Sequence, residues 1–414
     1  MANTIKTLSA GDITRKALSI LHNNLVFTKT INREYDDRFA RSGAKNGGTL
    51  LIREPNEFTI RSGAVMDTQD VEERTQTLTV ATQRGVDINF SSVELTLSLD
   101  DFADRILKPA MSRLASEVDK LVIENCYPYV WNIVNTTFGT QPVLADVLSA
   151  RAKLAQGLAP STDRRLMADA LGVNSIITAG HGIYAGQPAS ELSKQYEFGL
   201  VGDVYGFKFY ESEMTPVHTN GTRTETTPTV NLSTTTTSFV HAETTIKVTA
   251  FATGHDIHKG DVFTCIGVYD VNPETKTTLP HLKQWVCTER TTCYASVTNI
   301  PVSPTIYLSG AFQNCVITTA DAGALVITQT AGSSGAAGIG YRNDMAYHRD
   351  AFTFVTADLE MPRGVDFAAR EVFDGISLRV VRQYDIVNDK FPCRIDVLFG
   401  SKTTRPGWAC RLSA

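Results

Sequence analysis

The spacing of apolar residues near the start of the chain predicts a short amphipathic helix. Ala17, Leu21 and Leu25 recur every four residues, which places them in one row of a helix. The rest of the segment, through residues 33–41, has an extended, polar pattern with many cations. Residues 1–46 therefore predict an N-terminal arm that carries one helix, and a frayed terminus is the alternative.

A longer apolar stripe predicts the main helix of the chain over residues 98–134. Its positions follow spacings of three and four: Phe102, Ile106, Ala110, Leu114, Val118, Leu121 and Val122. Ser98 stands three residues before Asp101, as in a capping box that has Asp in place of Glu. We expect a kink or break at Pro109 and an end at Pro128, because proline cannot donate a helical hydrogen bond.

Alternating residues between these two helices predict strands over residues 47–99. The two arms of residues 50–82 read as a long projecting hairpin. Its tip is acidic and poor in large apolar residues: Asp67, Asp70, Glu72 and Glu73. An isolated hairpin buries little of its own surface. We therefore expect it to lie on another chain or to stay mobile, with an ordinary surface loop as the alternative.

Mixed α/β patterns occupy residues 135–215. A helix is expected over residues 144–158, closed by Gly157 and Pro160, and a strand over 173–178. A glycine-rich loop and a polar helix near 190–196 would follow. The segment Gly199–Ser212 then predicts a glycine turn that leads into an alternating strand.

The composition changes at Thr215 to one that favours strands. Fourteen of the residues 215–249 are threonine, and threonine is enriched in strands. Short strand-like runs follow, separated by Gly, Pro and Asn: residues 244–250, 261–268, 283–288, 293–297, 314–318 and 324–329. This pattern predicts a small all-β barrel or sandwich, closed by a Gly/Ala/Ser linker at residues 331–340.

After this linker the α/β pattern resumes. Strands are expected at residues 351–355, 376–386 and 393–399, and a short helix at 364–373. The simplest organisation is therefore an α/β domain in two halves, with the all-β domain inserted between them.

The length, charge and residue composition of the chain exclude several classes of protein. A chain of 414 residues is long enough for about two to four domains. Its 42% hydrophobic and 20% charged residues exclude global disorder. The net charge of −5 disfavours binding to nucleic acid by neutralising phosphates. No apolar run approaches the length of a membrane helix, and no secretory signal is expected. Seven scattered cysteines fit free thiols better than a disulfide framework.

Candidate chemical motifs are weak. The loop Thr178–Gly186, which contains His181, has its glycines spaced one residue too widely for a dinucleotide fingerprint. His255 and His258 lie in a glycine-flanked turn with no third ligand at a suitable spacing. The cysteines do not form paired metal-binding motifs. We therefore expect no catalytic, cofactor or metal site.

The order of the predicted parts resembles the major capsid proteins of tailed phages. The similarity is to the Hong Kong 97-type fold, in the branch of the Salmonella podovirus coat protein, which has an inserted β-domain. Three stretches carry most of it: Leu99–Val122 as the spine helix, Gly199–Phe207 as the axial-domain turn, and Arg379–Ile386 with Arg394–Gly400 and Thr404–Pro406 as the closing strands and tail. The turn Lys259–Asp261 also resembles part of the inserted domain.

The resemblance implies an α+β Hong Kong 97-like capsid fold and assigns its parts. These are an N-terminal arm (1–46), an E-loop hairpin with peripheral strands (47–99), a spine helix (98–134), the first half of an axial domain (135–215), an inserted all-β domain (216–342) and returning axial and peripheral strands (343–414). Copies of the chain would form the pentamers and hexamers of an icosahedral shell around double-stranded DNA, with a scaffolding protein and a portal protein as partners. Such a shell is assembled in the host bacterial cytoplasm, becomes the capsid of the virion and needs no cofactor.

Departures from the family limit what the resemblance implies. No lysine lies between Lys45 and Lys108, so a hairpin lysine cannot link subunits covalently, and a non-covalent shell is expected. Residues 233–241 contain no acid, so the charged contact that the inserted domain can make in the family is not expected here. We expect the insertion mainly to help the chain fold and to stiffen the capsomer.

Candidate assembly contacts come from the two charged segments. Asp67, Asp70, Glu72 and Glu73 would lie against a basic patch of an adjacent subunit, and the arm would contribute the arginines Arg33, Arg38 and Arg41. Which basic residues meet the hairpin is left open by the sequence.

Three other functions remain open at this point. An encapsulin-like shell protein shares the fold. A nucleotide-cofactor enzyme would depend on the loop at Gly180, and a β-rich tail or receptor-binding component would depend on residues 215–330. Negative-stain microscopy of the purified protein separates closed shells from a small oligomer or a trimer.

Overall fold

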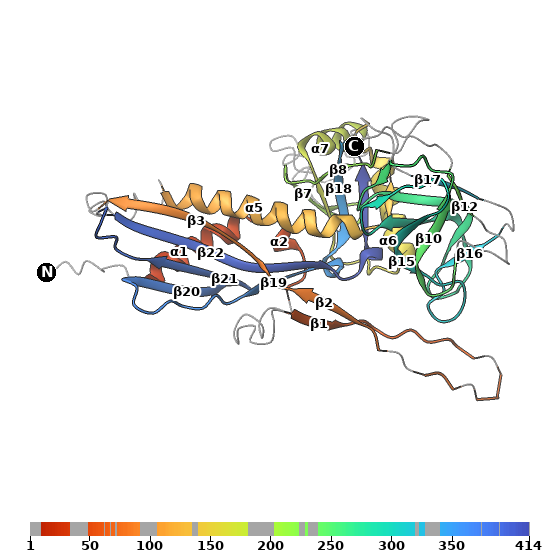
Figure 1. Cartoon of the computed structure of the whole chain (residues 1–414), viewed down its shortest axis with the longest axis horizontal. Coiled ribbons are helices and arrows are strands. Elements are labelled where there is room, and N and C mark those ends of the chain that lie inside the picture. The colour runs from red at the N-terminus through yellow and green to blue at the C-terminus, as the bar shows by residue number, and fades with distance from the viewer. Residues whose placement is uncertain are drawn as a thin grey trace, which may run out of the picture. The chain divides into compact units, whose positions relative to one another are not determined.

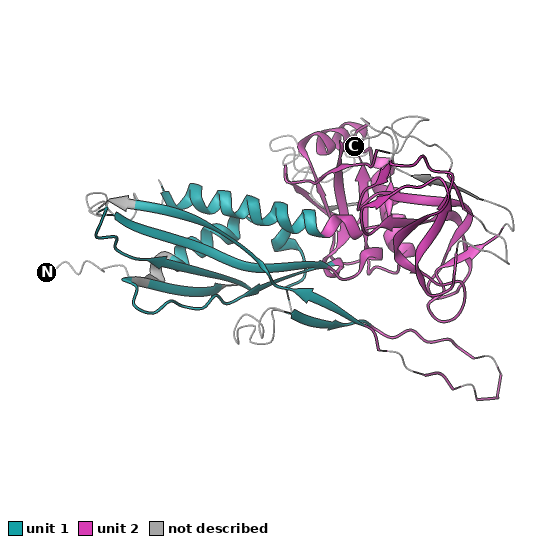
Figure 2. Cartoon of the chain, in the orientation of Figure 1, with its two compact units in different colours: residues 1–54, 75–125, 352–402 teal, residues 55–74, 126–351, 403–414 magenta. Residues whose placement is uncertain are grey.

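The computed structural model divides the chain into two compact units (Figures 1 and 2). Unit 1 comprises residues 1–54, 75–125 and 352–402, and unit 2 comprises residues 55–74, 126–351 and 403–414. The structure describes residues 10–33, 49–61, 63–66, 68–70, 73–91, 106–134, 140–180, 203–222, 228–230, 239–318, 323–327, 340–373, 375–388 and 390–413.

Unit 1 combines helices with antiparallel sheets. Its elements are α1 (Ala10–Asn24), α2 (Phe27–Thr30), β1 (Thr49–Arg53), β2 (Thr75–Thr79), β3 (Thr82–Ser91), α5 (Lys108–Cys126), β19 (Phe352–Ala357), β20 (Phe367–Phe373), β21 (Ile376–Arg382) and β22 (Lys390–Thr403). Five strands form one sheet in the order β19-β22-β21-β20, with β3 also paired to β22. Helix α1 packs against β20 and β21. The predicted N-terminal helix is confirmed, because Ala17, Leu21 and Leu25 are all buried.

Helix α5 is the described part of the predicted long helix. It buries the predicted apolar stripe, including Leu114, Val118 and Val122. The α-helix begins at Lys108 directly after two π-helical residues, 106–107, so the type of helix changes next to Pro109, where the sequence predicts a kink or break. It ends at Cys126, and Pro128 lies in the following 3-10 turn, as predicted. The expected capping box at Ser98 and Asp101 lies outside the described residues.

Unit 2 contains a mixed sheet with helices. Its elements outside the β-rich part are η3 (Tyr127–Tyr129), β4 (Ile133–Val134), α6 (Leu144–Gln156), β5 (Arg164–Ala168), α7 (Ala170–Gly180), β6 (Asp203–Val204), β7 (Phe207–Glu211), β8 (Val217–Thr219), β18 (Gly340–His348), η5 (Arg349–Ala351), η6 (Pro406–Trp408) and β23 (Ala409–Ser413). The sheet order is β4-β23-β18-β5-β7-β6, with β8 paired to β18. The apolar sides of α6 and α7 pack on it through residues such as Val147, Leu154 and Ile176.

A closed ring of antiparallel strands forms the β-rich part of unit 2, hereafter the β-barrel. Its strands are β9 (Thr229–Val230), β10 (Glu243–Thr249), β12 (Val262–Val271), β13 (Thr278–Cys287), β15 (Thr298–Ile306), β16 (Cys315–Ile317) and β17 (Gly323–Ile327). The order β13-β15-β10-β9-β17-β12 closes because β12 also pairs with β13, and β16 adds to β12. A two-stranded sheet joins β11 (Asp256–Ile257) to β14 (Thr291–Thr292). Trp285, Phe239 and Phe263 fill the core.

Two predicted elements have the wrong type. Residues 173–178 are part of helix α7, not a strand. The Asp169 carboxylate accepts a hydrogen bond from the Gly172 nitrogen at 2.6 Å and starts this helix, and its buried positions Val173 and Ile176 follow helical spacing. Conversely, the predicted helix at residues 364–373 contains strand β20, which pairs residue by residue with β21. Tertiary pairing overrides the helix propensity of its Ala and Glu residues.

The β-barrel differs most clearly from its prediction just before and within strand β15. Residues 293–297 are not a strand, and the strand β15 follows instead. It was missed because Pro301 and Pro304 suggest a loop. The structure accommodates Pro301 beside an irregularity in the pairing of β10 with β15, and bulges are where sheets tolerate proline.

Several predicted features lie outside the described residues. These are the strand at 93–99, the glycine-rich loop with His181, the polar helix at 190–196, most of the threonine-rich segment 233–241 and most of the linker 331–340. Within the part of the chain that the structure describes, no helix is both long and apolar enough to cross a membrane.

Candidate functional site

The predicted hairpin is present, and its base is anchored. Strands β1 and β2 pair antiparallel from Thr49 opposite Thr79 to Arg53 opposite Thr75. Side chains alternate across such a pair. Inward residues of β1 and β2, together with Val80 just after β2, are buried beside two residues of β19: Ile52, Leu78, Val80, Val355 and Ala357. The base therefore belongs to the core of unit 1.

The loop beyond this base, residues 55–74, is held by hydrogen bonds across its two arms. The Gln69 side-chain amide donates to the Thr59 carbonyl oxygen at 2.6 Å, and its oxygen accepts from the Thr59 nitrogen at 2.8 Å. Arg61 donates through Nη1 to the carbonyl oxygens of Gly63 and Val65. One side-chain amide thus replaces a backbone bridge, and the arms keep one relative register.

The loop stays outside the core, as predicted, but it also exposes large apolar side chains that the prediction did not weigh. Phe58, Ile60, Val65 and Met66 are 59%, 98%, 82% and 77% exposed. Monomeric proteins rarely cluster exposed apolar residues, and such clusters mark interaction surfaces. The prediction emphasised the acids of residues 63–74 and gave too little weight to Phe58 and Ile60 just before them. The loop is therefore both acidic and apolar.

The structure places three of the seven predicted contact residues. Asp70 and Glu73 are exposed on the loop in unit 2, and Arg33 is half-buried after α2 in unit 1. The other four, Asp67, Glu72, Arg38 and Arg41, lie outside the described residues. The predicted charge contact stays a prediction.

A buried carboxylate that the sequence analysis missed fixes the N-terminal segment. Asp119 on α5 accepts hydrogen bonds from the backbone nitrogens of Val26, Phe27 and Thr28 at 2.7, 3.2 and 2.9 Å, and from the Thr28 hydroxyl. These N–H groups begin α2 and have no partner within that helix. Asp119 therefore attaches the N-terminal segment to α5. The available signal was an acid beside the apolar stripe at Val118.

A second buried network surrounds the predicted Lys259–Asp261 turn. His218 donates through Nε2 to the Asp261 carboxylate at 2.7 Å, and Tyr127 donates to His218 Nδ1 at 3.2 Å. Burial lowers the pKa of His218, although the Asp261 carboxylate opposes this shift. Arg411 donates to the Gly260 carbonyl oxygen at 2.8 Å, and burial lowers its pKa to about 10. Because His218 and Asp261 are both buried, substrate cannot reach them, and this tyrosine, histidine and aspartate serve structure.

His258, one of the two histidines of the candidate metal turn, contacts an acid and a backbone carbonyl. His258 lies 3.3 Å from the Asp256 carboxylate, and its Nδ1 is 3.0 Å from the Thr219 carbonyl oxygen. Among the described residues, no three His, Cys, Asp or Glu side chains are placed to hold a metal ion. Burial raises the pKa of Cys265, Cys287 and other cysteines, so their thiols stay protonated at neutral pH.

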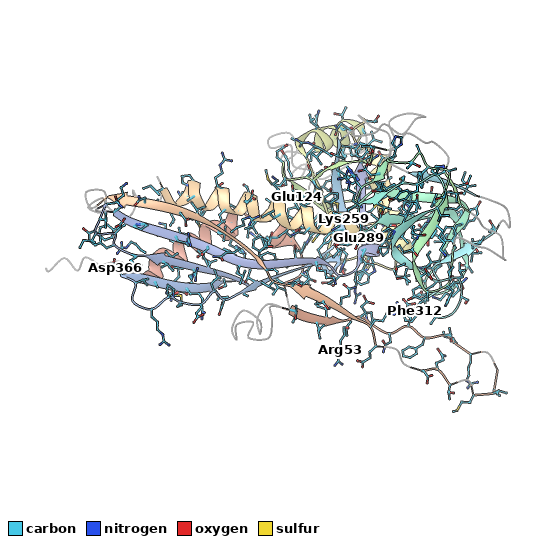
Figure 3. All side chains as sticks on the ribbon, in the orientation of Figure 1. Arg53, Glu124, Lys259, Glu289, Phe312 and Asp366 are labelled. Carbon is cyan, nitrogen blue, oxygen red and sulfur yellow. The ribbon has the colours of Figure 1, made fainter. Side chains whose placement is uncertain are left out.

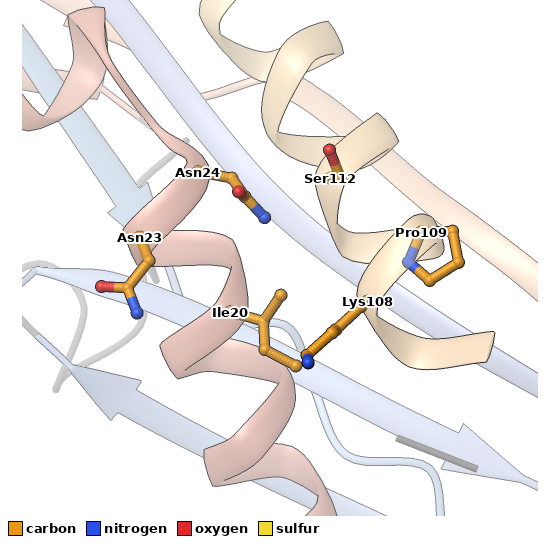
Figure 4. Close-up of a pocket in the computed structure, with 6 residues that line it drawn as sticks. All are labelled: Ile20, Asn23, Asn24, Lys108, Pro109 and Ser112. Carbon is orange, nitrogen blue, oxygen red and sulfur yellow. The ribbon is translucent and has the colours of Figure 1, made fainter. Parts of the chain in front are cut away.

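An open groove of about 410 Å³ lies in unit 1 between α1 and α5 (Figure 4). Its lining combines apolar and polar side chains: Ile20, Asn23, Asn24, Lys108, Pro109 and Ser112. Lys108 and Ser112 could in principle act as a base or a nucleophile, but among the described residues that line the groove there is no acid, thiol or histidine to activate either.

Comparisons with known proteins give a family and several similar folds. Residues 210–410 match the family described as P22 coat protein, gene protein 5. No curated protein matches the chain. Among solved structures, that of Mycobacterium phage Che8 is similar at 12% identity and a TM-score of 0.47, covering 94% of this chain and 90% of the other. The mature capsid of bacteriophage PhiM1 is similar at 12% identity and a TM-score of 0.41, covering 89% of this chain and 82% of the other. The capsid of cyanophage P-SCSP1u is similar at 10% identity and a TM-score of 0.43, covering 89% of this chain and 83% of the other.

The family match covers the chain from strand β7 to strand β23, and so includes the whole β-barrel and the returning strands. It agrees with the resemblance that the sequence suggested, and it favours a virus coat over an encapsulin-like compartment. The mixture of helices with antiparallel and mixed sheets confirms the predicted α+β class. Residues 210–410, slightly less than half of the chain, are thus similar to the P22 coat protein family, in line with the resemblance to tailed-phage capsid proteins that the sequence suggested.

Proposed function

We propose that copies of this chain build the pentamers and hexamers of an icosahedral shell by laying the loop 55–74 on a neighbouring copy. The observation that carries this proposal is the exposure of Phe58, Ile60, Val65 and Met66 on a loop whose base is firmly anchored. Fully burying one such side chain is worth about 1.5–3 kcal/mol. Repeated around each ring of subunits, this gain supports a closed shell.

The charges of the loop orient the association of subunits more than they add to its binding free energy. Asp70 and Glu73 are exposed, and each exposed ion pair is worth about 0–1 kcal/mol. With Asp67 and Glu72 they give the loop an acidic tip that is steered towards a basic surface, and the arginines Arg33, Arg38 and Arg41 of the arm contribute to contacts between subunits.

The shell is held together without covalent links. No lysine lies between Lys45 and Lys108, so the loop has no amine that could form an isopeptide bond with a neighbour. Mature particles should therefore dissociate to single chains on a denaturing gel. A ladder of linked subunits would contradict this part of the proposal.

The shell encloses double-stranded DNA without gripping it. The net charge of −5 supports confinement, because a strongly basic lining would bind the phosphates. A scaffolding protein guides assembly in the host cytoplasm, a portal protein occupies one vertex, and the chain catalyses no reaction. Helix α5 serves as the spine, the two sheets with helices serve as peripheral and axial domains, and the β-barrel is the inserted domain.

Electron microscopy of the purified full-length protein tests the proposal. We expect closed particles of megadalton mass, either spontaneously or after co-expression with a scaffolding protein from the same virus. A uniform small oligomer under both conditions would overturn the proposal, and a trimer that binds carbohydrate would favour a receptor-binding component instead.

A further inference from the structure

A short turn of the β-barrel presents two aromatic rings in a fixed arrangement. Residues 307–314 connect β15 to β16. The Tyr307 carbonyl oxygen accepts from the Asn314 nitrogen at 3.0 Å, and the Asn314 side-chain oxygen accepts from the Tyr307 nitrogen at 3.1 Å. Gly310, with a φ of +86°, allows the chain to reverse. The rings of Tyr307 and Phe312 lie 5.7 Å apart on this turn.

Arg74, at the returning end of the loop 55–74, lies on these rings. Its guanidinium carbon is 3.7 Å from the centre of the Phe312 ring and 5.0 Å from that of Tyr307. Its Nη2 also donates to the Tyr307 hydroxyl at 2.6 Å. The flat guanidinium stacks on the Phe312 ring and donates to the Tyr307 hydroxyl at the same time, a combination that a compact ammonium group makes less well. Figure 3 labels Phe312.

The outgoing arm of the loop meets the same part of the β-barrel through Lys276. Its ammonium group lies 3.7 Å from the Glu57 carboxylate and donates to the Ala311 carbonyl oxygen. Lys276 sits in the turn between β12 and β13, which is closed by a hydrogen bond from its nitrogen to the Asn272 carbonyl oxygen at 3.0 Å. Each arm of the loop therefore has its own charged contact with a rigid turn.

We propose that these two turns, residues 272–277 and 307–314, form a clamp that holds the loop 55–74 of the same chain in one direction before assembly. The inference rests on the proposed role of that loop. It gives the inserted β-barrel a function beyond folding and stiffening. An unclamped loop must be ordered when it binds a neighbour, and this lost freedom opposes association. A clamp removes part of that cost in advance and leaves the apolar tip free for the partner.

Limited trypsin cleavage after Arg61 on the unassembled full-length subunit tests the clamp. Arg74→Ala, outside the β-barrel, and Phe312→Ala, within it, each remove the stacking. We expect each to speed cleavage after Arg61 about tenfold, since such a contact is worth about one such factor in an equilibrium. Phe312→Tyr keeps a ring and should cleave nearly as slowly as the native chain. Arg74→Lys keeps the charge but loses the flat group, so it should cleave faster.

Tyr294→Ala is the matched control, because Tyr294 is an exposed aromatic residue of the same β-barrel away from this contact. It should leave the cleavage rate unchanged. An unchanged rate in both Arg74→Ala and Phe312→Ala would overturn the clamp, as would an equal acceleration in Tyr294→Ala. Because the readout needs no shell, faster cleavage in a protein that never forms particles would retain the clamp and reject the proposed function.

Discussion

The β-barrel and the hairpin loop are both built from strands and turns, but the barrel buries its large apolar side chains whereas the loop exposes them. The barrel closes its hydrogen-bonded ring and buries Trp285, Phe263 and Phe239 in its own core. The loop 55–74 leaves Ile60 and Met66 almost wholly in solvent, although its base is buried. One region is complete within the single chain, whereas the other becomes complete only against another surface.

The same contrast applies to their charges. In the barrel, Asp270 pairs with the Lys283 ammonium at 2.9 Å and lies 3.4 Å from His281. On the loop, Asp70 and Glu73 are exposed to solvent. The barrel thus pairs this carboxylate within its own structure, whereas these two acids of the loop remain in solvent, where a neighbouring surface could meet them. The predictions below test this distinction.

The largest effect is expected from opening the core of the β-barrel. Trp285→Ala removes a fully buried ring that packs on Phe239 at 5.4 Å, and such changes cost about 3–5 kcal/mol of unfolding free energy. Urea unfolding followed by hydrogen exchange of barrel peptides should report this loss. The exposed control Tyr294→Ala should shift the barrel by less than about 0.5 kcal/mol. If Trp285→Ala left the unfolding free energy of the barrel unchanged, the barrel would not depend on its own buried core for stability.

A smaller effect is expected from the internal ion pair of the barrel. Burial alone would raise the pKa of Asp270, but Lys283 and the hydrogen bonds of His281 and Lys283 outweigh it and lower the pKa to about 2. The ionised carboxylate therefore stabilises the fold above the ordinary pKa of 3.8, and this contribution is lost as the pH falls through about 2.

Asp270→Asn should consequently cost about 2 kcal/mol at pH 7, and roughly half as much at pH 3. Unfolding free energies of the native chain and the variant at both pH values measure the difference. Glu274→Gln, an exposed change in the adjoining turn, is the control and should be neutral at both. A cost that does not fall with pH would assign the effect to packing and not to charge.

The smallest effect on stability is expected at the tip of the loop. Replacing Asp67, Asp70, Glu72 and Glu73 with their amides should change the unfolding free energy of the subunit very little. It should slow assembly at low salt, where steering by charge is strongest. Light scattering at several salt concentrations measures the rate. If the variant assembled as fast as the native chain at every salt concentration, the acids would have no role in assembly.

The sequence predicted the elements whose local pattern and final environment agree. The stripe of α5 and the alternating strands of the barrel bury the residues that their periods selected. The sequence predicted the wrong element where contacts with other segments determine the secondary structure. The run from Val173 to Thr178 is rich in β-branched residues but is started as a helix by Asp169, and residues 367–373 become a strand because β21 pairs with them.

Only part of the candidate site was predicted from the sequence. The acidic residues and the hairpin could be recognised, because charges and alternation are visible in a single segment. The role of Asp119 depends on Val26 and Thr28, which are about 90 residues away in the chain. Likewise, nothing local links Arg74 to Phe312. Contacts between segments this far apart leave no periodic signal.

Assembly of an Ile60→Asp/Met66→Asp variant tests the central claim most directly. Charges on these two exposed side chains should leave the subunit folded, with the pairing of β1 and β2 and the barrel still protected from hydrogen exchange. Electron microscopy should then find no closed shells, whereas Ile60→Val/Met66→Leu should form them normally. A doubly charged loop that still yields shells in native numbers would contradict the account.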